Sequence, residues 1–72
     1  MISDLTERQA QILDYIRGYI GRHGYGPSRE EIATAHNFSH QTASYYLKEL
    51  RSKGHVDWKD NQARTLRVIE ES

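Results

Sequence analysis

Cysteine is absent from this chain of 72 residues, and this absence excludes a disulfide framework and a zinc site that uses thiolates. Proline, tryptophan, phenylalanine and methionine occur only once each. No apolar run approaches the roughly 18 residues of a membrane span, and the first residues lack the basic and apolar regions of a secretion signal. We therefore expect one cytoplasmic domain over residues 1–72, without membrane contact.

An excess of charge of either sign is also lacking, because ten basic and ten acidic residues give a formal net charge of zero. A nucleic-acid-binding domain normally carries an excess of lysine and arginine to neutralise phosphates. The charges are unevenly distributed, however, since the part from His36 to Arg67 holds six basic residues against three acidic ones. This part is a candidate for phosphate contact, and the alternative is an ordinary solvated surface of mixed charge.

Two helix-start signals stand only eleven residues apart in the middle of the chain. Ser28 is followed three residues later by Glu31, a capping box, and Ser39 is a second N-cap residue. Between them, Asn37 is one of the few residues other than glycine that tolerates the left-handed conformation of a sharp turn. This pattern predicts a helix-turn-helix, in which the later helix can enter a DNA major groove.

An earlier helix and a later hairpin complete the predicted fold. The capping box from Thr6 to Gln9 begins a helix that carries an apolar stripe and ends near Gly24. After Gly54 the apolar period changes from helical to alternating, with Val56 and Trp58 in one strand, a turn over residues 60–64 and a returning strand over residues 65–69. The expected fold is therefore mostly α with a small β-hairpin, a three-helix winged helix-turn-helix.

The third predicted helix, over about residues 39–52, divides into two faces. Helical spacing places an apolar set toward the core: Ala43, Tyr46, Leu47 and Leu50. The same spacing leaves a polar set facing outward: His40, Gln41, Ser44, Tyr45 and Lys48. Hydrogen-bonding side chains are thus expected where base edges could be contacted.

Several segments, in order, follow the pattern of one family: Leu5-Thr-x-Arg-Gln9, Gly24-x-x-Pro-Ser-Arg-x-Glu-Ile-Ala33, Leu47-Lys-x-Leu50, Lys53-Gly54 and Arg64-x-Leu-Arg67. In these segments the chain resembles the N-terminal DNA-binding domain of the LexA repressors of the bacterial SOS response. The resemblance implies a repressor that contacts its operator with the third helix, and phosphates with the second helix and the wing. It does not carry over the operator sequence, because the outward side chains of the third helix differ, as do His36 and Asn37.

The resemblance also assigns residues to each part of the DNA. Carried over by position, base contacts are expected from Ser39, Gln41, Thr42, Ser44 and Tyr45. Phosphate contacts are expected from Ser28, Arg29, Lys53 and Arg64, to which we add Lys59 of the predicted wing. Gln41 can form paired hydrogen bonds with adenine, although it could instead only decorate the first turn, and Arg64 could instead pair with Asp60.

Catalytic and metal chemistry are not expected of this chain. His36 and His40 are four residues apart, but the predicted turn lies between them, so the two do not converge as metal ligands on one helix face. The Gly-x-Ser-x-Gly elbow of serine hydrolases is absent. LexA repressors also have a self-cleaving second domain that cuts an Ala-Gly bond, and this chain has no Ala-Gly dipeptide. We expect no enzyme, no metal and no cofactor, and either an excised domain or a small stand-alone regulator.

The predicted function is sequence-specific binding of double-stranded DNA, as a transcriptional repressor. The alternative is a winged-helix module that binds only protein, since a fold alone does not establish function. No coiled-coil heptad or second domain provides a dimer interface. We therefore expect a monomer in solution that pairs only on DNA.

Overall fold

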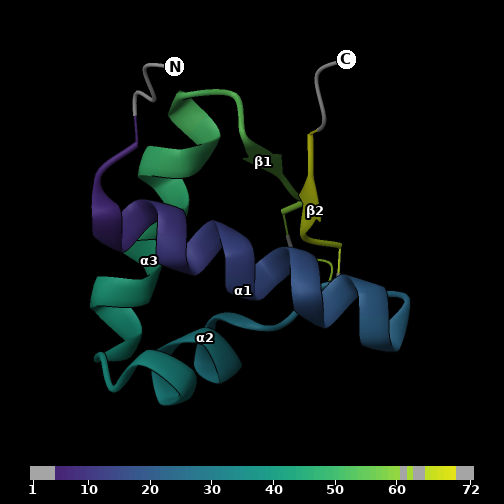
Figure 1. Ribbon diagram of the computed structural model, residues 1–72, viewed down its shortest axis with the longest axis horizontal. Coiled ribbons are helices and arrows are strands. Elements are labelled where there is room, and N and C mark those ends of the chain that lie inside the picture. Colours follow the sequence, from purple (N-terminus) through teal and green to yellow (C-terminus); the bar gives the residue numbers. More distant parts are fainter. Residues whose placement is uncertain (1–4, 61, 63–64, 70–72) are drawn as a thin grey trace.

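The computed structural model describes residues 5–60, 62 and 65–69, which form three helices followed by a pair of short strands (Figure 1). The helices are α1 (Glu7–His23), α2 (Arg29–His36) and α3 (His40–Ser52), and the strands are β1 (Val56–Asp57) and β2 (Arg67–Val68). This order confirms the predicted winged helix-turn-helix. None of the helices in the described ranges is long and apolar enough to cross a membrane.

The ends of α1 follow from its capping residues. Thr6 Oγ1 accepts a hydrogen bond from the backbone N–H of Gln9, and Gln9 Oε1 accepts one from the backbone N–H of Thr6, both at 3.1 Å. This reciprocal pair satisfies two of the free N–H groups that every helix start leaves. Gly24 ends the helix in the left-handed conformation, with φ of 82°, as its position predicted.

The helix-turn-helix is built in the same way. Ser28 and Glu31 form a second reciprocal capping box at the start of α2, and Ser39 Oγ accepts from the backbone N–H of Thr42 at the start of α3. Asn37 has φ of 60° and ψ of 42°, the left-handed conformation that lets the chain turn sharply between the two helices. Local sequence therefore determines where both helices begin and how they are joined.

One apolar core joins all three helices to the hairpin. Its largest fully buried side chains come from each of these elements except β2: Ile12, Ile16, Ile32, Leu50 and Val56. From the predicted inner face of α3, Ala43, Leu47 and Leu50 are buried, whereas Tyr46 is half-buried and stacks on Phe38 with ring centroids 5.3 Å apart. The core holds α3 by one side, which leaves the opposite side of the helix exposed.

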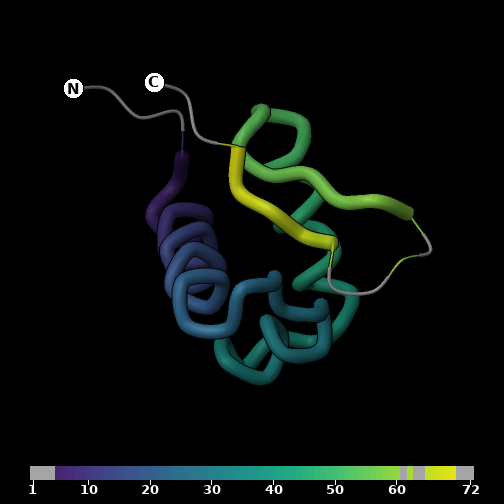
Figure 2. The backbone as a smooth tube through the Cα atoms, turned by 90° about the vertical axis from the view of Figure 1, so that its right-hand side faces the viewer, coloured from purple at the N-terminus to yellow at the C-terminus, as the bar shows by residue number. Residues whose placement is uncertain are grey.

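The hairpin of residues 55–69, which we call the wing, is shorter in its regular pairing than the sequence predicted. Its strands are antiparallel and run side by side in Figure 2, and within the described residues the ladder pairs Val56 with Val68 and Asp57 with Arg67. Beyond them, Thr65 Oγ1 accepts from the backbone N–H of Lys59 at 2.9 Å, so a side chain occupies a donor that a longer ladder would use. Part of the predicted turn, residues 61, 63 and 64, lies outside the described residues.

Candidate nucleic-acid interface

The side of α3 that faces away from the core is polar and exposed. Gln41, Tyr45 and Lys48 are exposed there and Ser44 is half-buried, so four of the outward-facing side chains that the sequence predicted are accessible to some degree. Tyr45 is the most exposed large hydrophobic residue in the described ranges, with 59% of its surface accessible. The major groove of B-DNA is wide enough to admit one α-helix with its side chains, so these polar side chains could reach base edges there.

Ser39 and Thr42 differ from these residues because their hydroxyl groups are already used within the protein. The two oxygens lie 2.9 Å apart, and Ser39 Oγ also accepts the backbone N–H of Thr42 at 3.1 Å. A hydroxyl group can make up to three hydrogen bonds, so each of the two retains some capacity for a further partner. Both residues therefore stabilise the start of α3, and the methyl group of Thr42 remains available for an apolar contact.

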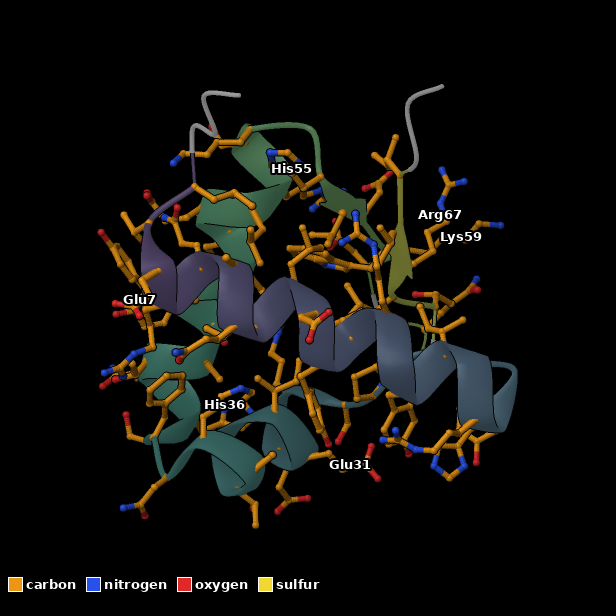
Figure 3. All side chains as sticks on the ribbon, in the orientation of Figure 1. Glu7, Glu31, His36, His55, Lys59 and Arg67 are labelled. Atoms are coloured by element: carbon orange, nitrogen blue, oxygen red, sulfur yellow. The ribbon has the colours of Figure 1, made fainter. Side chains whose placement is uncertain are left out.

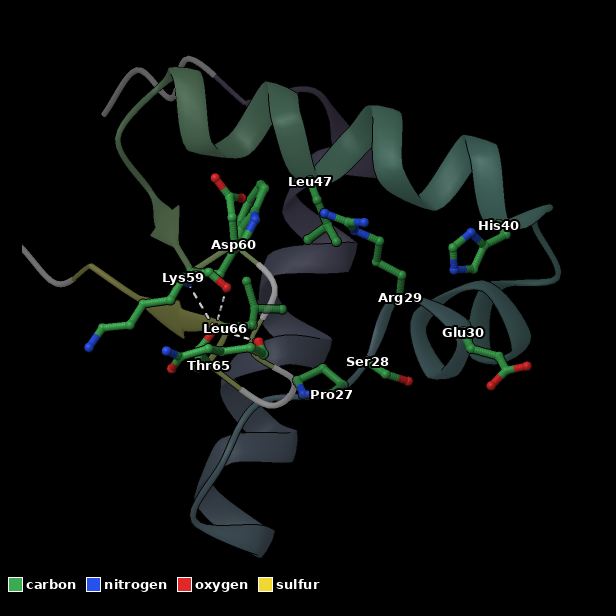
Figure 4. Close-up of a pocket in the computed structure, with 12 residues that line it drawn as sticks. Pro27, Ser28, Arg29, Glu30, His40, Leu47, Lys59, Asp60, Thr65 and Leu66 are labelled. Atoms are coloured by element: carbon green, nitrogen blue, oxygen red, sulfur yellow. Dashed lines mark hydrogen bonds between the residues drawn. The ribbon is translucent and has the colours of Figure 1, made fainter.

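An open groove of about 640 Å³ lies between the start of α2, α3 and the wing. Among its lining residues are Ser28, Arg29, His40 and Lys59. Figure 4 shows Arg29 directed toward α3 and His40 at the start of that helix, whereas the side chain of Lys59 points away from the groove. Ser28 Oγ accepts the backbone N–H of Glu31 at 3.1 Å, so its first role is to cap α2.

Basic side chains project from the outer side of the wing. Figure 3 shows Lys59 and Arg67 at the edge of the molecule that the wing forms, whereas the labelled acids Glu7 and Glu31 lie on α1 and α2. Both basic residues are exposed. In the described part of the wing, however, Asp57 and Asp60 balance these two charges, and Arg67 Nη2 lies 3.6 Å from Asp57 Oδ2.

The remaining two predicted phosphate contacts lie apart from the groove or outside the described residues. Lys53 follows the last turn of α3, at the opposite end of that helix from Ser39, about 20 Å away at the rise of an α-helix. Its Nζ donates to Gln9 Oε1 at 2.9 Å. Arg64 lies outside the described residues, so its predicted role and its alternative pairing with Asp60 are not tested.

Sequence reasoning placed Trp58 beside Val56 in a strand and counted Arg51 and Asp57 only in the charge balance, but it did not predict that the fold brings these three residues together. Arg51 Nε lies 3.0 Å from Asp57 Oδ1, and the Arg51 guanidinium carbon lies 4.3 Å from the centre of the Trp58 ring. On the same ring, the guanidinium carbon of Arg29 lies 5.7 Å from the centre. The only signal in the sequence was the change from helical to alternating period after Gly54, which does not tell which α3 side chain meets the wing.

The ionised form of Asp57 is stabilised by its neighbours. The backbone N–H of Trp58 donates to its Oδ1 at 2.9 Å, and Arg51 and Arg67 lie 3.0 and 3.6 Å from its two oxygens. These interactions, the backbone hydrogen bond first, lower the pKa of Asp57 from its ordinary value of 3.8, against a smaller opposing effect of desolvation.

This pKa predicts a pH-dependent contribution to folding. Because the pKa is lower in the folded state, Asp57 stabilises the fold above the pKa of the unfolded chain, and that contribution is lost as the pH falls through the folded value. The wild type should therefore be more stable than Asp57→Asn at neutral pH, and the difference should close as the pH falls from the ordinary pKa of 3.8 through the lower pKa of the folded state. Thermal unfolding across this range measures it. Asp14→Asn, at an exposed position on α1, is the control, and an equal closing of the gap for both variants would contradict the assignment.

The two histidines considered as metal ligands lie in different surroundings. His36 Nδ1 is 3.0 Å from the carbonyl oxygen of Ile32, and its ring stacks on Phe38 at 5.5 Å. His40 is exposed on the groove. Within residues 5–60, 62 and 65–69, no three histidine, aspartate or glutamate side chains converge in a way that could hold a metal ion.

Comparison with known proteins identifies relatives along most of the chain. The model of the LexA DNA-binding domain family matches residues 2–65. The chain is 38% identical over 72 residues to the LexA repressor of Pseudothermotoga lettingae, covering all of this chain and 36% of that protein. It is 42% identical over 67 residues to the LexA repressor of Aromatoleum aromaticum, covering 92% of this chain and 33% of that protein.

A third relative is named a transcription regulator and not specifically a repressor. The chain is 38% identical over 66 residues to the transcription regulator LexA of a Synechocystis species, covering 90% of this chain and 32% of that protein. The chain thus spans about a third of the length of the curated relatives that it matches.

Proposed function

Because this chain belongs to the LexA DNA-binding domain family, we propose that it binds double-stranded DNA in a sequence-specific manner and represses transcription. The observation that carries the proposal is the arrangement of α3. Its inner side is held in the core, and its outer side exposes Gln41, Tyr45 and Lys48 beside a groove lined by Arg29. A rigid helix with exposed hydrogen-bonding groups is the device by which helix-turn-helix proteins contact base edges.

Within this function, the N-cap residue of α3 and side chains of the helix itself read the bases. They are Ser39, Gln41, Thr42, Ser44 and Tyr45, with Gln41 contributing most because its amide can form two hydrogen bonds with one adenine. The backbone phosphates are bound by Ser28, Arg29, Lys53, Lys59 and Arg64. Arg29 is best supported among these, because its side chain is directed toward α3 across the groove, whereas Ser28 caps α2 and the side chain of Lys59 points away (Figure 4).

The domain acts without catalysis, in the cytoplasm, as a monomer that pairs on DNA. A single small domain makes few base contacts, and helix-turn-helix repressors gain affinity by placing two copies on symmetric half-sites. Sedimentation of the free protein at micromolar concentration, followed by titration with one and then two half-sites, tests this assembly. A stable dimer without DNA would contradict it.

The DNA-binding function itself is tested by a salt titration. Binding to mixed-sequence DNA should weaken steeply as salt rises, because each phosphate contact releases condensed counterions. A module that binds only protein would show no such loss. Selection of preferred sites from random DNA then supplies the operator for all further measurements.

Arg29→Ala should weaken binding to all DNA sequences similarly and lower the slope of the salt dependence by about one. The reason is that Arg29 contacts a phosphate and therefore carries no base preference. Affinities for the selected site and for mixed DNA at several salt concentrations measure both effects. Arg22→Ala is the matched control, because it removes the same charge from an exposed position in the last turn of α1. A loss confined to the selected site would reject the phosphate role.

A further inference from the structure

One side chain of α3 contacts three residues of the wing. The Arg51 guanidinium donates to Asp57 Oδ1 at 3.0 Å and to the carbonyl oxygen of Trp58 at 3.3 Å, and it lies 3.9 Å from Asp60 Oδ1. It also lies over the Trp58 ring, 4.3 Å from its centre. Four contacts of one planar group therefore connect α3 to the first arm of the wing, residues 55–60; the second arm is residues 65–69.

Most of the other hydrogen bonds among the described residues of the wing lie within the wing itself. Within its described residues, two residue pairs join its strands, and the backbone N–H of Ile69 donates to the carbonyl oxygen of His55 at 2.8 Å. Arg67 also lies 3.6 Å from Asp57 Oδ2, and Thr65 Oγ1 bonds to the backbone of Lys59 and Gln62. These bonds close the wing on itself. The start of the wing is also attached to α3 through the backbone, because the N–H of His55 donates to the carbonyl oxygen of Leu50 at 2.9 Å. The second arm is attached through the apolar side chain of Leu66, which is buried in the core.

We propose that Arg51 is a positioning residue that fixes the first arm of the wing against α3, so that the two contact DNA as one rigid surface. The proposal rests on the DNA-binding function proposed above. The residue whose position depends most directly on it is Lys59, which stands between Trp58 and Asp60, two residues that Arg51 contacts. In this role Arg51 acts through the wing and makes no base contact of its own.

The chemistry of the contact requires arginine and not merely a positive charge. A planar guanidinium can stack its face on an indole ring while its N–H groups donate within the plane of the group. A lysine ammonium has three donors but no flat face, so it cannot keep this stack and these in-plane hydrogen bonds at the same time. The side chains of Arg51 and Asp57 are 41% and 36% exposed, and ion pairs as exposed as these contribute little to folding stability. The contact therefore serves orientation more than stability, and loss of Arg51 should leave the domain folded.

A double-mutant cycle on DNA binding tests the proposal. Arg51→Ala should weaken binding to the selected site about five- to tenfold, and Lys59→Ala should have little further effect in that background, because the two residues act through one element. Arg51→Lys should behave like Arg51→Ala, since it keeps the charge but not the planar fork. Gln41→Ala should keep its full effect in the Arg51→Ala background. Unfolding curves confirm that each variant is folded, and Arg22→Ala is again the control for loss of charge.

Three results would overturn the proposal. If the Arg51→Lys variant bound the selected DNA site as tightly as the wild type does, only the positive charge of residue 51 would matter for binding. If the double variant lost affinity by the product of the fold-losses of Arg51→Ala and Lys59→Ala, the two residues would act independently. Unchanged binding by Arg51→Ala would remove the role altogether. Each of these differs from failure of the proposed function, in which the wild-type protein itself would show no salt-dependent binding to DNA.

Discussion

Replacing Gln41 by alanine should cost about 1–3 kcal/mol of binding free energy on the preferred DNA site, a loss of about 5- to 150-fold in affinity, and much less on mixed-sequence DNA. Gln41 is the second residue of α3 and is exposed on its outer side. There its amide can donate to one and accept from the other of the two groups that adenine presents in the major groove. Without the amide, the adenine loses both partners and the preference for that base disappears.

The measurement compares equilibrium binding of wild type and variant on both DNAs at one salt concentration. Gln11→Ala is a matched control, because Gln11 is also an exposed helical glutamine but lies on α1. It should change neither affinity. Alanine favours helix slightly more than glutamine does, so a folding defect is not expected at either position. Equal losses on the two DNAs would show that Gln41 does not read a base.

Gly26→Ala should lower the free energy of unfolding by about 1–3 kcal/mol, the usual cost of placing an extra group in a packed interior. Gly26 is buried in the loop before α2, where an added Cβ would lie 2.2 Å from the carbonyl oxygen of Leu66 and 2.9 Å from its carbonyl carbon. Both are backbone atoms, so the clash is relieved only if the loop and the second arm of the wing move apart. In a domain of this size, a loss of about 2 kcal/mol corresponds to about 8–16 °C in Tm.

Alanine at two other glycine positions serves as a control, because those positions have no steric clash and test only helix propensity and backbone conformation. Gly21 lies inside α1, where an added Cβ would have no atom within 4 Å, so Gly21→Ala should stabilise the protein by up to about 1 kcal/mol. At Gly24 an added Cβ would also have no atom within 4 Å, but φ is 82°, so Gly24→Ala should lower the free energy of unfolding because of backbone conformation alone. Thermal unfolding of the three variants is the measurement. A Tm for Gly26→Ala equal to that of the wild type would contradict the close contact.

Short-range patterns in the sequence were enough to predict most of the fold. Thr6, Ser28 and Ser39 are N-caps as predicted, and Asn37 adopts the left-handed turn between α2 and α3. These features depend on hydrogen bonds between residues three or four positions apart, so the local sequence contains all that is needed. The outward side of α3 was predictable for the same reason, since helical spacing alone decides which side chains face away from the core.

The tertiary structure decided how the wing is held and which residues surround the groove. The alternating pattern after Gly54 predicted longer strands than the two residue pairs that form, because the pattern reports which side chains face the core and not how far backbone pairing extends. The contacts of Arg51 with Asp57 and Trp58, and the close approach of Gly26 to Leu66, join elements that are separate in the sequence. No local spacing encodes such contacts, because they depend on how the helices and the wing pack around one core.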